Sequence, residues 1–231
     1  MYEALKEQVC QANLDLVRQG LVTLTWGNVS GISDDRQHVV IKASGVPYDV
    51  MRSEHMVVVD FSGKVVEGDL CPSSDTLTHV LLYQHFDCVG GITHTHSRFA
   101  TSFAQARVEI PCLGTTHADH FQGPVPVTRV LGEKEVTEAY EANTGRVIIE
   151  RFANLDPVAM PAILVAGHAP FTWGMTAAKS VENAVALEAV AEMALVTQHL
   201  TGDLPLLESY LLDKHYQRKH GSDAYYGQRK N

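Results

Sequence analysis

LVTLTWGNVSGISDDRQHVVIKASGVPYDVMRSEHMVVVDFSGKVV, residues 21–66, is the stretch that decides the fold. Apolar residues recur in it with the period of two that is typical of β-strands, and Asp34-Asp35, Ser44-Gly45 and Ser62-Gly63 form turn signals between them. These patterns predict short strands at 21–25, 28–32, 38–41, 56–61 and 64–66. Consecutive strands joined by tight turns favour an antiparallel sheet.

Helical periodicity appears on both sides of this stretch. Leu5, Val9, Ala12 and Leu16 recur at steps of four and three, and Gly20 marks a helix end. Further helices are predicted at 76–86, with Ser and Asp of the preceding 72–75 suited to cap it, at 98–106 after the possible cap Ser97, at 133–143, 177–200 and 205–220. Strands are predicted at 147–150 and 162–165, besides one around 92–96. Helices that flank a mainly antiparallel sheet predict an α/β sandwich formed as one domain over residues 1–231.

Composition excludes several classes of function. The chain has 231 residues, 45% of them hydrophobic, and a formal charge of −9. This acidic balance argues against non-specific binding of nucleic acid, which needs clustered Lys and Arg. Basic residues do gather towards the C-terminus, where they form either a solvated tail or a binding surface for an anionic small molecule. They are Lys214, Arg218, Lys219, Arg229 and Lys230.

Cysteine usage and the absence of targeting patterns predict the compartment. Cys10, Cys71, Cys88 and Cys112 are widely spaced, which is not the pattern of a disulfide framework and favours a reducing environment. The sequence shows neither a signal peptide nor a run of 18 apolar residues. We therefore expect a cytoplasmic protein that does not associate with membranes.

The run Ile92-Thr93-His94-Thr95-His96-Ser97 predicts a metal site. Alternate side chains of an extended strand share a face, so His94 and His96 point the same way, and neutral imidazole binds zinc and similar metals. His168 follows an apolar strand and is the strongest candidate for a third ligand, and Asp75 is the best carboxylate candidate. Other histidines compete for the third position, namely His79, His85, His117 and His120.

Three short segments have the composition of oxyanion-binding loops. They are Trp26-Gly27-Asn28, Lys42-Ala43-Ser44-Gly45 and Ser73-Ser74. Glycine lets a ligand approach the backbone closely, and the start of a helix favours an anion. Each segment alone is an ordinary turn or cap, but together with the lysine they would form a phosphate cradle.

Seven longer runs resemble the L-ribulose-5-phosphate 4-epimerases of the class II aldolase/adducin-like family. The resemblance covers nearly the whole chain, and the runs are LVTLTWGNVS (21–30), IKASGVPYDVM (41–51), MVVVDFSGKVVEG (56–68), PSSDTLTH (72–79), GGITHTHSRFAT (90–101), GTTHADHF (114–121) and KHYQRKHGSDAYYGQ (214–228). Two positions depart from the family pattern: His120 stands where we expect Tyr, and Ala169 follows the third histidine where we expect Gly.

The resemblance implies a three-layer α/β/α sandwich, a homotetramer, and active sites between neighbouring subunits. By position, it also implies a divalent metal, normally one Zn²⁺ per subunit with Mn²⁺ or Co²⁺ as possible substitutes, at His94, His96 and His168 with Asp75 beside them. The implied phosphate-binding residues are Gly27, Asn28, Ser44, Gly45, Ser73 and Ser74, with Lys42 nearby. Asp119 and Tyr226 match the acid/base pair of the family, and His215 and Arg218 match residues that reach the site from the tail.

The activity expected from the resemblance is interconversion of L-ribulose 5-phosphate and D-xylulose 5-phosphate, with the phosphorylated ketopentose as the partner. A class II sugar-phosphate aldolase would share the same metal and phosphate residues, and remains open as an alternative. A non-catalytic, adducin-like interaction domain is a third interpretation, against which the intact histidines and Asp75 argue. The sequence does not distinguish arabinose from ascorbate catabolism, because both can supply the same intermediate.

Overall fold

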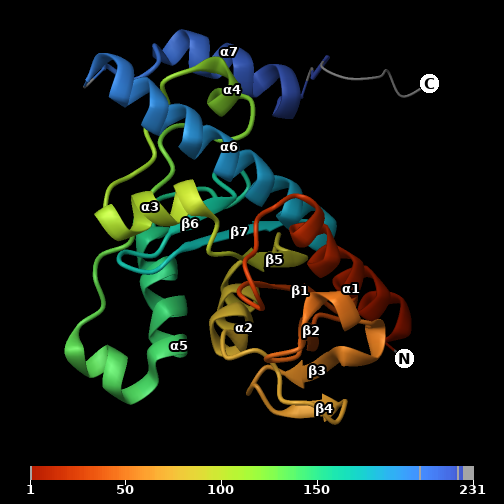
Figure 1. Ribbon diagram of the computed structural model, residues 1–231. Helices are drawn as coiled ribbons and strands as arrows, with labels where there is room; N and C mark the ends of the chain where they lie inside the picture. Colours follow the sequence, from red (N-terminus) through yellow and green to blue (C-terminus); the bar gives the residue numbers. More distant parts are fainter. Residues whose placement is uncertain (1, 203, 223, 226–231) are drawn as a thin grey trace.

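A computed structural model describes residues 2–202, 204–222 and 224–225 (Figure 1). Its centre is a seven-stranded sheet in the order β4-β3-β2-β1-β5-β7-β6, and neighbouring strands pair antiparallel throughout. The strands are β1 (Asn28–Ile32), β2 (His38–Lys42), β3 (Met56–Asp60), β4 (Val65–Glu67), β5 (Gly91–His94), β6 (Ala162–Leu164) and β7 (Pro170–Gly174). The prediction of a mixed α/β fold with a central antiparallel sheet is confirmed.

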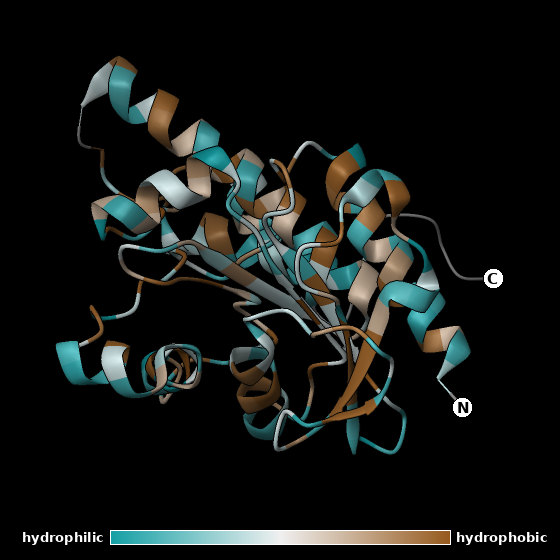
Figure 2. Ribbon diagram, turned by 60° about the horizontal axis from the view of Figure 1, so that its bottom comes forward, coloured by the Kyte–Doolittle hydropathy of each residue, from teal (hydrophilic) through white to brown (hydrophobic). Residues whose placement is uncertain are grey.

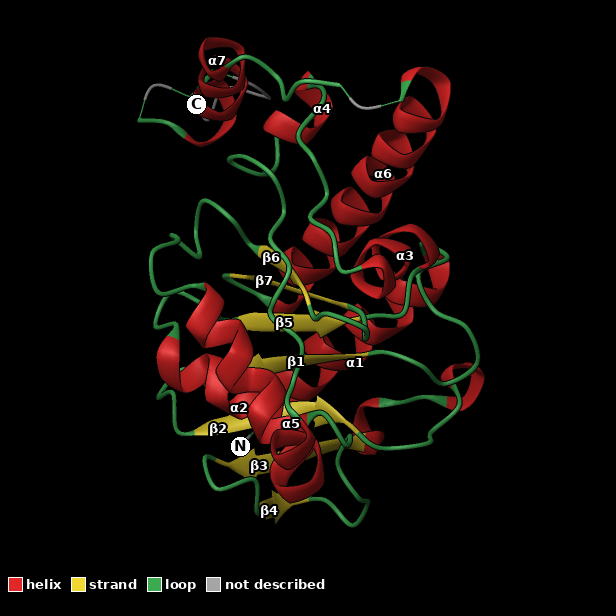
Figure 3. Cartoon of the chain, turned by 90° about the vertical axis from the view of Figure 1, so that its left-hand side faces the viewer, coloured by secondary structure: helices red, strands yellow, loops and turns green. Residues whose placement is uncertain are grey.

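Helices cover both faces of the sheet. They are α1 (Glu3–Arg18), α2 (Thr76–His85), α3 (Arg98–Ala106), α4 (Thr115–Ala118), α5 (Glu133–Arg151), α6 (Ala177–Thr201) and α7 (Ser209–His220), besides the short 3₁₀ turns Tyr48–Val50 and Ser53–His55. Seen from the side in Figure 3, α2 and α5 lie over one face and α1 lies behind the other. The sheet is therefore the middle layer of three.

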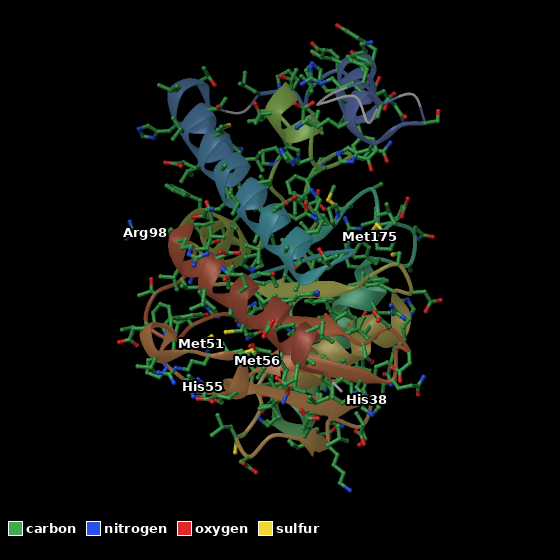
Figure 4. All side chains as sticks on the ribbon, turned by 90° about the vertical axis from the view of Figure 1, so that its right-hand side faces the viewer. His38, Met51, His55, Met56, Arg98 and Met175 are labelled. Carbon is green, nitrogen blue, oxygen red and sulfur yellow. The ribbon has the colours of Figure 1, made fainter. Side chains whose placement is uncertain are left out.

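Successive residues of β2 and β3 belong to different cores. Val40 and Val58 pack with α1 and the start of α6, whereas Val39, Val57 and Val59 pack on the side of α2. Because both faces are covered, the strand residues are buried at nearly every position, including polar ones such as Ser30 and Thr93. Figure 2 shows brown and paler segments within the sheet, between helices of mixed colour. Figure 4 views the side on which α1 and α6 lie together and labels two residues of that core, Met51 and Met56.

Some predicted elements match closely, while residues 21–25 do not form a strand. β1 has the predicted bounds, and β3 ends one residue earlier than expected. In 21–25, Leu24 has a left-handed φ of 54°, and Gly27 follows with φ 83°. A Cβ on Gly27 would lie 2.9 Å from the carbonyl oxygen of His94. The chain turns here so that its backbone passes against the end of β5, which only glycine permits.

The predicted strand at 147–150 is wrong, because these residues continue helix α5 to Arg151. The helix predicted at 133–143 stops short of Gly145. In the structure Gly145 lies within α5, where this helix packs closely on α2, and a Cβ there would meet Leu81 at 3.1 Å. Val147 and Ile148 are buried on the inner side of this helix. A short apolar run fits a buried helix as well as a strand, so periodicity alone misassigned it.

Two helix caps, the start of α7 and strand β7 also differ from expectation. The side chains of Ser97 and Asp75 make no capping hydrogen bond at the starts of α3 and α2. The carboxylate of Glu188, on α6, accepts the backbone N–H groups of Phe99 and Ala100 at 2.9 and 3.0 Å and so replaces Ser97 as the cap. Helix α7 begins at 209 rather than 205, and β7 was not predicted as a strand.

Helices α4 and α7 lie side by side beyond the edge of the sheet, near the C-terminal half of α6 (Figures 1 and 3). In the described parts of the chain, no helix has the length and apolar character needed to cross a membrane. The expectation of a single domain over residues 1–231 stays a prediction.

Candidate metal and phosphate site

Three histidines converge where β5 ends beside the β6–β7 turn. His94 is the last residue of β5 and pairs with Phe171 of β7, which brings the turn that carries His168 next to it. His96 lies two residues beyond His94, in the connection to α3. One ring nitrogen from each histidine lies within 4.8 Å of those of the other two. The structure thus brings together the three predicted histidine ligands.

Hydrogen bonding orients His94 as a metal ligand. Its Nδ1 lies 2.9 Å from the carbonyl oxygen of Pro170, which can only accept, so Nδ1 carries the proton. Nε2 therefore presents its lone pair, 3.1 Å from Nε2 of His96. The ring also stacks on Phe171 at a centroid distance of 4.2 Å. A backbone carbonyl that fixes the outer nitrogen in this way is common behind metal-binding histidines.

Burial keeps the other two imidazoles in the neutral form that binds metals. It lowers the pKa of His96 to about 4, and repulsion from His94 adds to the effect. The pKa of His168 is likewise lowered to about 4, chiefly by burial and then by repulsion from His94 and His96. At neutral pH His96 and His168 are therefore uncharged nitrogen donors. Its donor chemistry fits Zn²⁺ and related divalent ions.

Asp75 lines the same cavity, but its carboxylate is not part of the three-histidine cluster. Its Oδ2 accepts a hydrogen bond of 2.7 Å from the side-chain amide of Asn28. Burial acts to raise the pKa of Asp75, but attraction to His94 and His79 and the bond from Asn28 hold it below its usual value. Asp75 is thus an ionised carboxylate beside the cluster, and its role as a ligand stays a prediction.

The competing histidines make other contacts. His79 is fully buried with Nδ1 against Ser30 Oγ at 2.7 Å, and burial lowers its pKa to about 3. His117 donates through Nε2 to the carbonyl of Gly123 at 2.8 Å. Of the described residues, only His94, His96 and His168 form a group with the spacing of metal ligands. This outcome favours His168 over the alternatives left open by the sequence.

The cluster opens into a cavity of about 560 Å³. All seven residues predicted to bind phosphate line it: Gly27, Asn28, Lys42, Ser44, Gly45, Ser73 and Ser74. Burial lowers the pKa of Lys42, partly offset by Asp75, and its ammonium group lies 5.1 Å from the ring centre of Tyr48. The cavity therefore combines a set of metal ligands with hydroxyl, amide and ammonium donors suited to an anionic group.

Four residues that line this cavity were given no role of their own in the sequence analysis: Thr25, Trp26, Tyr140 and Glu141. The ring of Trp26, about half exposed, lies 6.0 Å from that of His96. Tyr140 and Glu141 reach the cavity from α5. Their segment has an ordinary helical sequence, and a break in the helix at Ala139 that the pattern does not reveal places them there.

Asp119 belongs to a separate charged cluster. It follows α4, does not line the cavity of the histidines, and is held by side chains of α7. Arg218 binds both carboxylate oxygens, at 3.0 and 2.6 Å, and His215 Nδ1 lies 3.0 Å from Oδ1. Lys219 lies 3.7 Å from Oδ2, and His220 Nε2 donates to the backbone carbonyl at 2.9 Å.

The charges in this second cluster keep Asp119 ionised. Burial acts to raise the pKa of its carboxyl, but hydrogen bonds from Arg218 and His215 and the charge of Lys219 hold the pKa below its usual value. The structure thus brings together three of the four residues expected to act around proton transfer, Asp119, His215 and Arg218. The fourth, Tyr226, lies outside the described residues.

A family model named "Class II Aldolase and Adducin N-terminal domain" matches residues 7–195. The chain belongs to this family. Among solved structures, the class II aldolase fold recurs in an L-fuculose 1-phosphate aldolase with 24% identity and a TM-score of 0.76, over 93% of this chain and 95% of that one.

Two further relatives show the same fold at similar divergence. A putative aldolase/epimerase/decarboxylase, YgbL from Klebsiella pneumoniae, has 21% identity and a TM-score of 0.71, over 93% of this chain and 98% of that one. The L-fuculose-1-phosphate aldolase from Thermus thermophilus has 23% identity and a TM-score of 0.67, over 88% of this chain and all of that one. At these identities the class II aldolase fold is shared, while activity has to be argued from the site.

Proposed function

We propose that this class II aldolase family member is an epimerase that interconverts L-ribulose 5-phosphate and D-xylulose 5-phosphate. The observation that carries the proposal is a single cavity lined both by three convergent imidazoles and by the lysine, serine and glycine residues of the predicted phosphate cradle. A phosphorylated ketose needs both features, one for the carbonyl end and one for the phosphate. The long runs that resemble the epimerases select this reaction within the family.

The reaction inverts C4, a carbon that bears a hydroxyl but no acidic hydrogen, so simple proton abstraction cannot achieve it. Cleavage of the C3–C4 bond solves this problem: the C4 hydroxyl loses its proton, its carbon becomes an aldehyde, and the bond electrons move to C3 of the ketone fragment. Glycolaldehyde phosphate then turns its other face and the bond re-forms. A divalent ion at the three histidines would supply Lewis acidity to the ketone and the neighbouring hydroxyl.

The residues of this chain have distinct tasks in the proposal. Lys42, Ser44 and Ser73 would hold the phosphate, so that the aldehyde fragment stays bound while it rotates. Glycine at 45 leaves open space around the backbone, since a Cβ there would contact nothing within 4 Å. Retaining the fragment is what separates an epimerase from an aldolase that releases it.

Proton transfer at C4 would fall to Asp119 and Tyr226, one on each face of the sugar. Because Asp119 does not line the histidine cavity of its own chain, we propose that a second copy supplies this pair, within a homotetramer. His215 and Arg218 would then support the reaction by holding Asp119.

The four cysteines are free thiols, which supports placing the protein in the cytoplasm.

A sugar-phosphate aldolase is the second candidate, because two of the structures with this fold are described as L-fuculose 1-phosphate aldolases. Such an enzyme would use the same cavity but release the aldehyde. The adducin-like, non-catalytic alternative has less support, since that role does not need three imidazoles whose ring nitrogens lie within 4.8 Å of one another.

Product analysis tests the proposal directly. Protein loaded with Zn²⁺ is incubated with L-ribulose 5-phosphate while D-xylulose 5-phosphate and free glycolaldehyde phosphate are followed separately. We expect the xylulose product without accumulation of the aldehyde. Stoichiometric release of glycolaldehyde phosphate would establish an aldolase instead, and no turnover of L-ribulose 5-phosphate by the Zn²⁺-loaded protein would contradict the epimerase. The same assay with Mn²⁺ or Co²⁺ identifies the metals that support turnover.

A further inference from the structure

Helix α5 is broken at the point where it reaches the cavity. Ala139 has φ −161° and ψ 67°, far from helical values, although residues on both sides are helical. The two residues that follow, Tyr140 and Glu141, are those that α5 contributes to the cavity wall. The break therefore lies where it determines how these side chains approach the histidines.

Side chains compensate for the backbone hydrogen bonds that such a break removes. The buried amide of Asn143 donates to the carbonyl of Glu135 at 2.8 Å, across the break. Thr78, on α2, donates to the carbonyl of Glu141 at 2.6 Å. Arg146 in turn binds Oδ1 of Asn143 at 2.6 Å. Bonds from two helices thus hold the broken conformation in place.

The broken helix places the phenol of Tyr140 against the third histidine, His168. Tyr140 Oη lies 3.3 Å from Nδ1 of His168, and their ring centres are 6.1 Å apart. Burial raises the pKa of Tyr140, and the charges of Asp75 and Glu141 raise it further, so the side chain stays an uncharged phenol. Since Tyr140 occupies Nδ1, the nitrogen of His168 that remains for the cluster is Nε2.

We propose that Tyr140 is a positioning residue for His168: its phenol oxygen accepts the Nδ1–H bond and thereby fixes Nε2 as the metal-binding nitrogen. The carbonyl of Pro170 does the same for His94, so two of the three ligands are oriented from behind, one by the backbone and one by a side chain. The inference rests on the proposed metal site, but not on which sugar phosphate is the substrate.

Metal affinity tests the inference without any reaction. Tyr140→Phe keeps the ring and removes only the hydroxyl, so we expect Zn²⁺ to bind about 10- to 100-fold more weakly, the range seen when such outer partners are lost. Affinity is measured at pH 7 by competition with a chromophoric chelator, and the absorption spectrum of bound Co²⁺ reports a change in ligand geometry. Tyr210→Phe, which alters an exposed tyrosine on α7, is the matched control and should bind as wild type.

A second variant examines the broken helix itself. Asn143→Ser removes the long amide that bridges the break, without changing Tyr140 or any histidine, and should also weaken Zn²⁺ binding. Its unfolding temperature is measured alongside, so that a general loss of structure is recognised. If Tyr140→Phe folds poorly, the affinity of Asn143→Ser relative to its folded fraction decides the question.

The outcomes separate the inference from the proposed function. Wild-type Zn²⁺ affinity and an unchanged Co²⁺ spectrum in Tyr140→Phe would overturn the positioning role, whatever the reaction. Weakened binding in a protein that does not epimerise L-ribulose 5-phosphate would support the role and contradict only the proposed activity. A wild-type chain that binds no divalent metal would overturn both.

Discussion

The histidine cavity and the Asp119 cluster treat their ionisable groups in opposite ways. In the cavity, burial lowers the pKa of His96 and His168 to about 4 and leaves neutral donors facing one another. At Asp119, the positive groups of α7 surround one carboxylate and keep it charged. The first arrangement has lone pairs directed at a common point and gains by binding a cation, whereas the second is already neutralised within the chain. In the proposed function, the first region would bind the metal and the substrate, and the second would be a preassembled group offered to another copy.

Replacing a histidine of the cavity is the largest perturbation. His96→Ala should remove bound Zn²⁺ and reduce turnover by at least about 10⁴-fold, because Lewis-acid stabilisation is worth several kcal/mol. Metal content after dialysis and the epimerase assay are the measurements. The exposed His199→Ala on α6 is the control. Full turnover in a metal-free His96→Ala protein would remove the metal from the mechanism.

Changing Asp119 should affect turnover without affecting the metal. Asp119→Asn keeps the shape but loses the charge paired with Arg218 and His215, so we expect turnover to fall about 10²-fold or more, as when a general acid or base is lost. Zn²⁺ affinity should stay at the wild-type value, because the residue is not in the cavity. The control is Asp213→Asn, which changes an exposed carboxylate on α7, the helix that carries His215 and Arg218. A parallel loss of Zn²⁺ would contradict the division into two regions.

Mixing the two inactive variants tests whether the regions meet between copies. A hybrid oligomer of His96→Ala and Asp119→Asn chains contains some sites in which an intact cavity faces an intact Asp119. Activity that appears only after the chains are unfolded and reassembled together is the expected result. Mixtures that remain as inactive as either parent would indicate that each chain completes its own site.

The two regions should also differ in how they respond to acid. His96 and His168 of the cavity, with pKa values of about 4, take up protons near pH 6.5 once the chain unfolds, and so do two buried histidines outside it, His79 and His117, with values of about 3 and 4. The unfolded state then binds more protons, so the free energy of unfolding of the metal-free protein should fall as the pH decreases from about 6.5 to 4.

The lowered pKa of Asp119 acts in a different window. Its stabilising contribution is complete above the ordinary carboxyl pKa of 3.8 and is lost only as the pH falls below that value. Urea unfolding at intervals between pH 7 and 3 would separate the two windows. Stability that is flat from pH 6.5 to 4 would show that the imidazoles are not held neutral by folding.

The smallest expected effect lies in the phosphate wall. Ser44→Ala removes one hydroxyl from the cavity and should weaken the binding of inorganic phosphate by about five-fold, which corresponds to about 1 kcal/mol for one hydrogen bond. Isothermal titration with phosphate measures it, and Ser102→Ala on the exposed side of α3 is the control. Equal affinity in the two variants would remove Ser44 from the proposed cradle.

Much of the site was predictable because its residues lie in local patterns. The His-x-His run is recognisable from its spacing alone, although His96 lies just beyond the end of β5. The seven cradle residues lie in three short segments, at the start of β1, at the end of β2 with the turn after it, and just before α2. His168 was predicted as a ligand, but its position beside His94 depends on the pairing of β5 with β7. The sequence analysis did not reveal this pairing, because it did not predict β7 as a strand. Contacts between residues far apart in the sequence could not be predicted. The cap of α3 comes from Glu188 on α6 instead of Ser97. The position of Tyr140 depends on a helix break that is stabilised by hydrogen bonds from residues of α2 and α5.

The misassigned segment at 147–150 has the same origin. Its three apolar residues, Val147 to Ile149, fit either element, and the close packing of Gly145 on α2, which is a tertiary contact, favours the helix. The opposite holds for Asp119. Its place in a family motif predicted a role in proton transfer, but only the structure shows that it does not line the histidine cavity of its own chain.

The two tryptophans give the cavity an optical reporter. The chain contains only Trp26 and Trp173, and Trp173 is sealed in the core at 1% exposure, while Trp26 is 51% exposed beside His96. Solvent contact shifts indole emission to longer wavelengths, so the red edge of the fluorescence spectrum belongs to Trp26. Titration with a quenching ion such as Co²⁺ should first reduce the emission intensity at this red edge. Metal binding at the three histidines can then be followed without a label or a substrate.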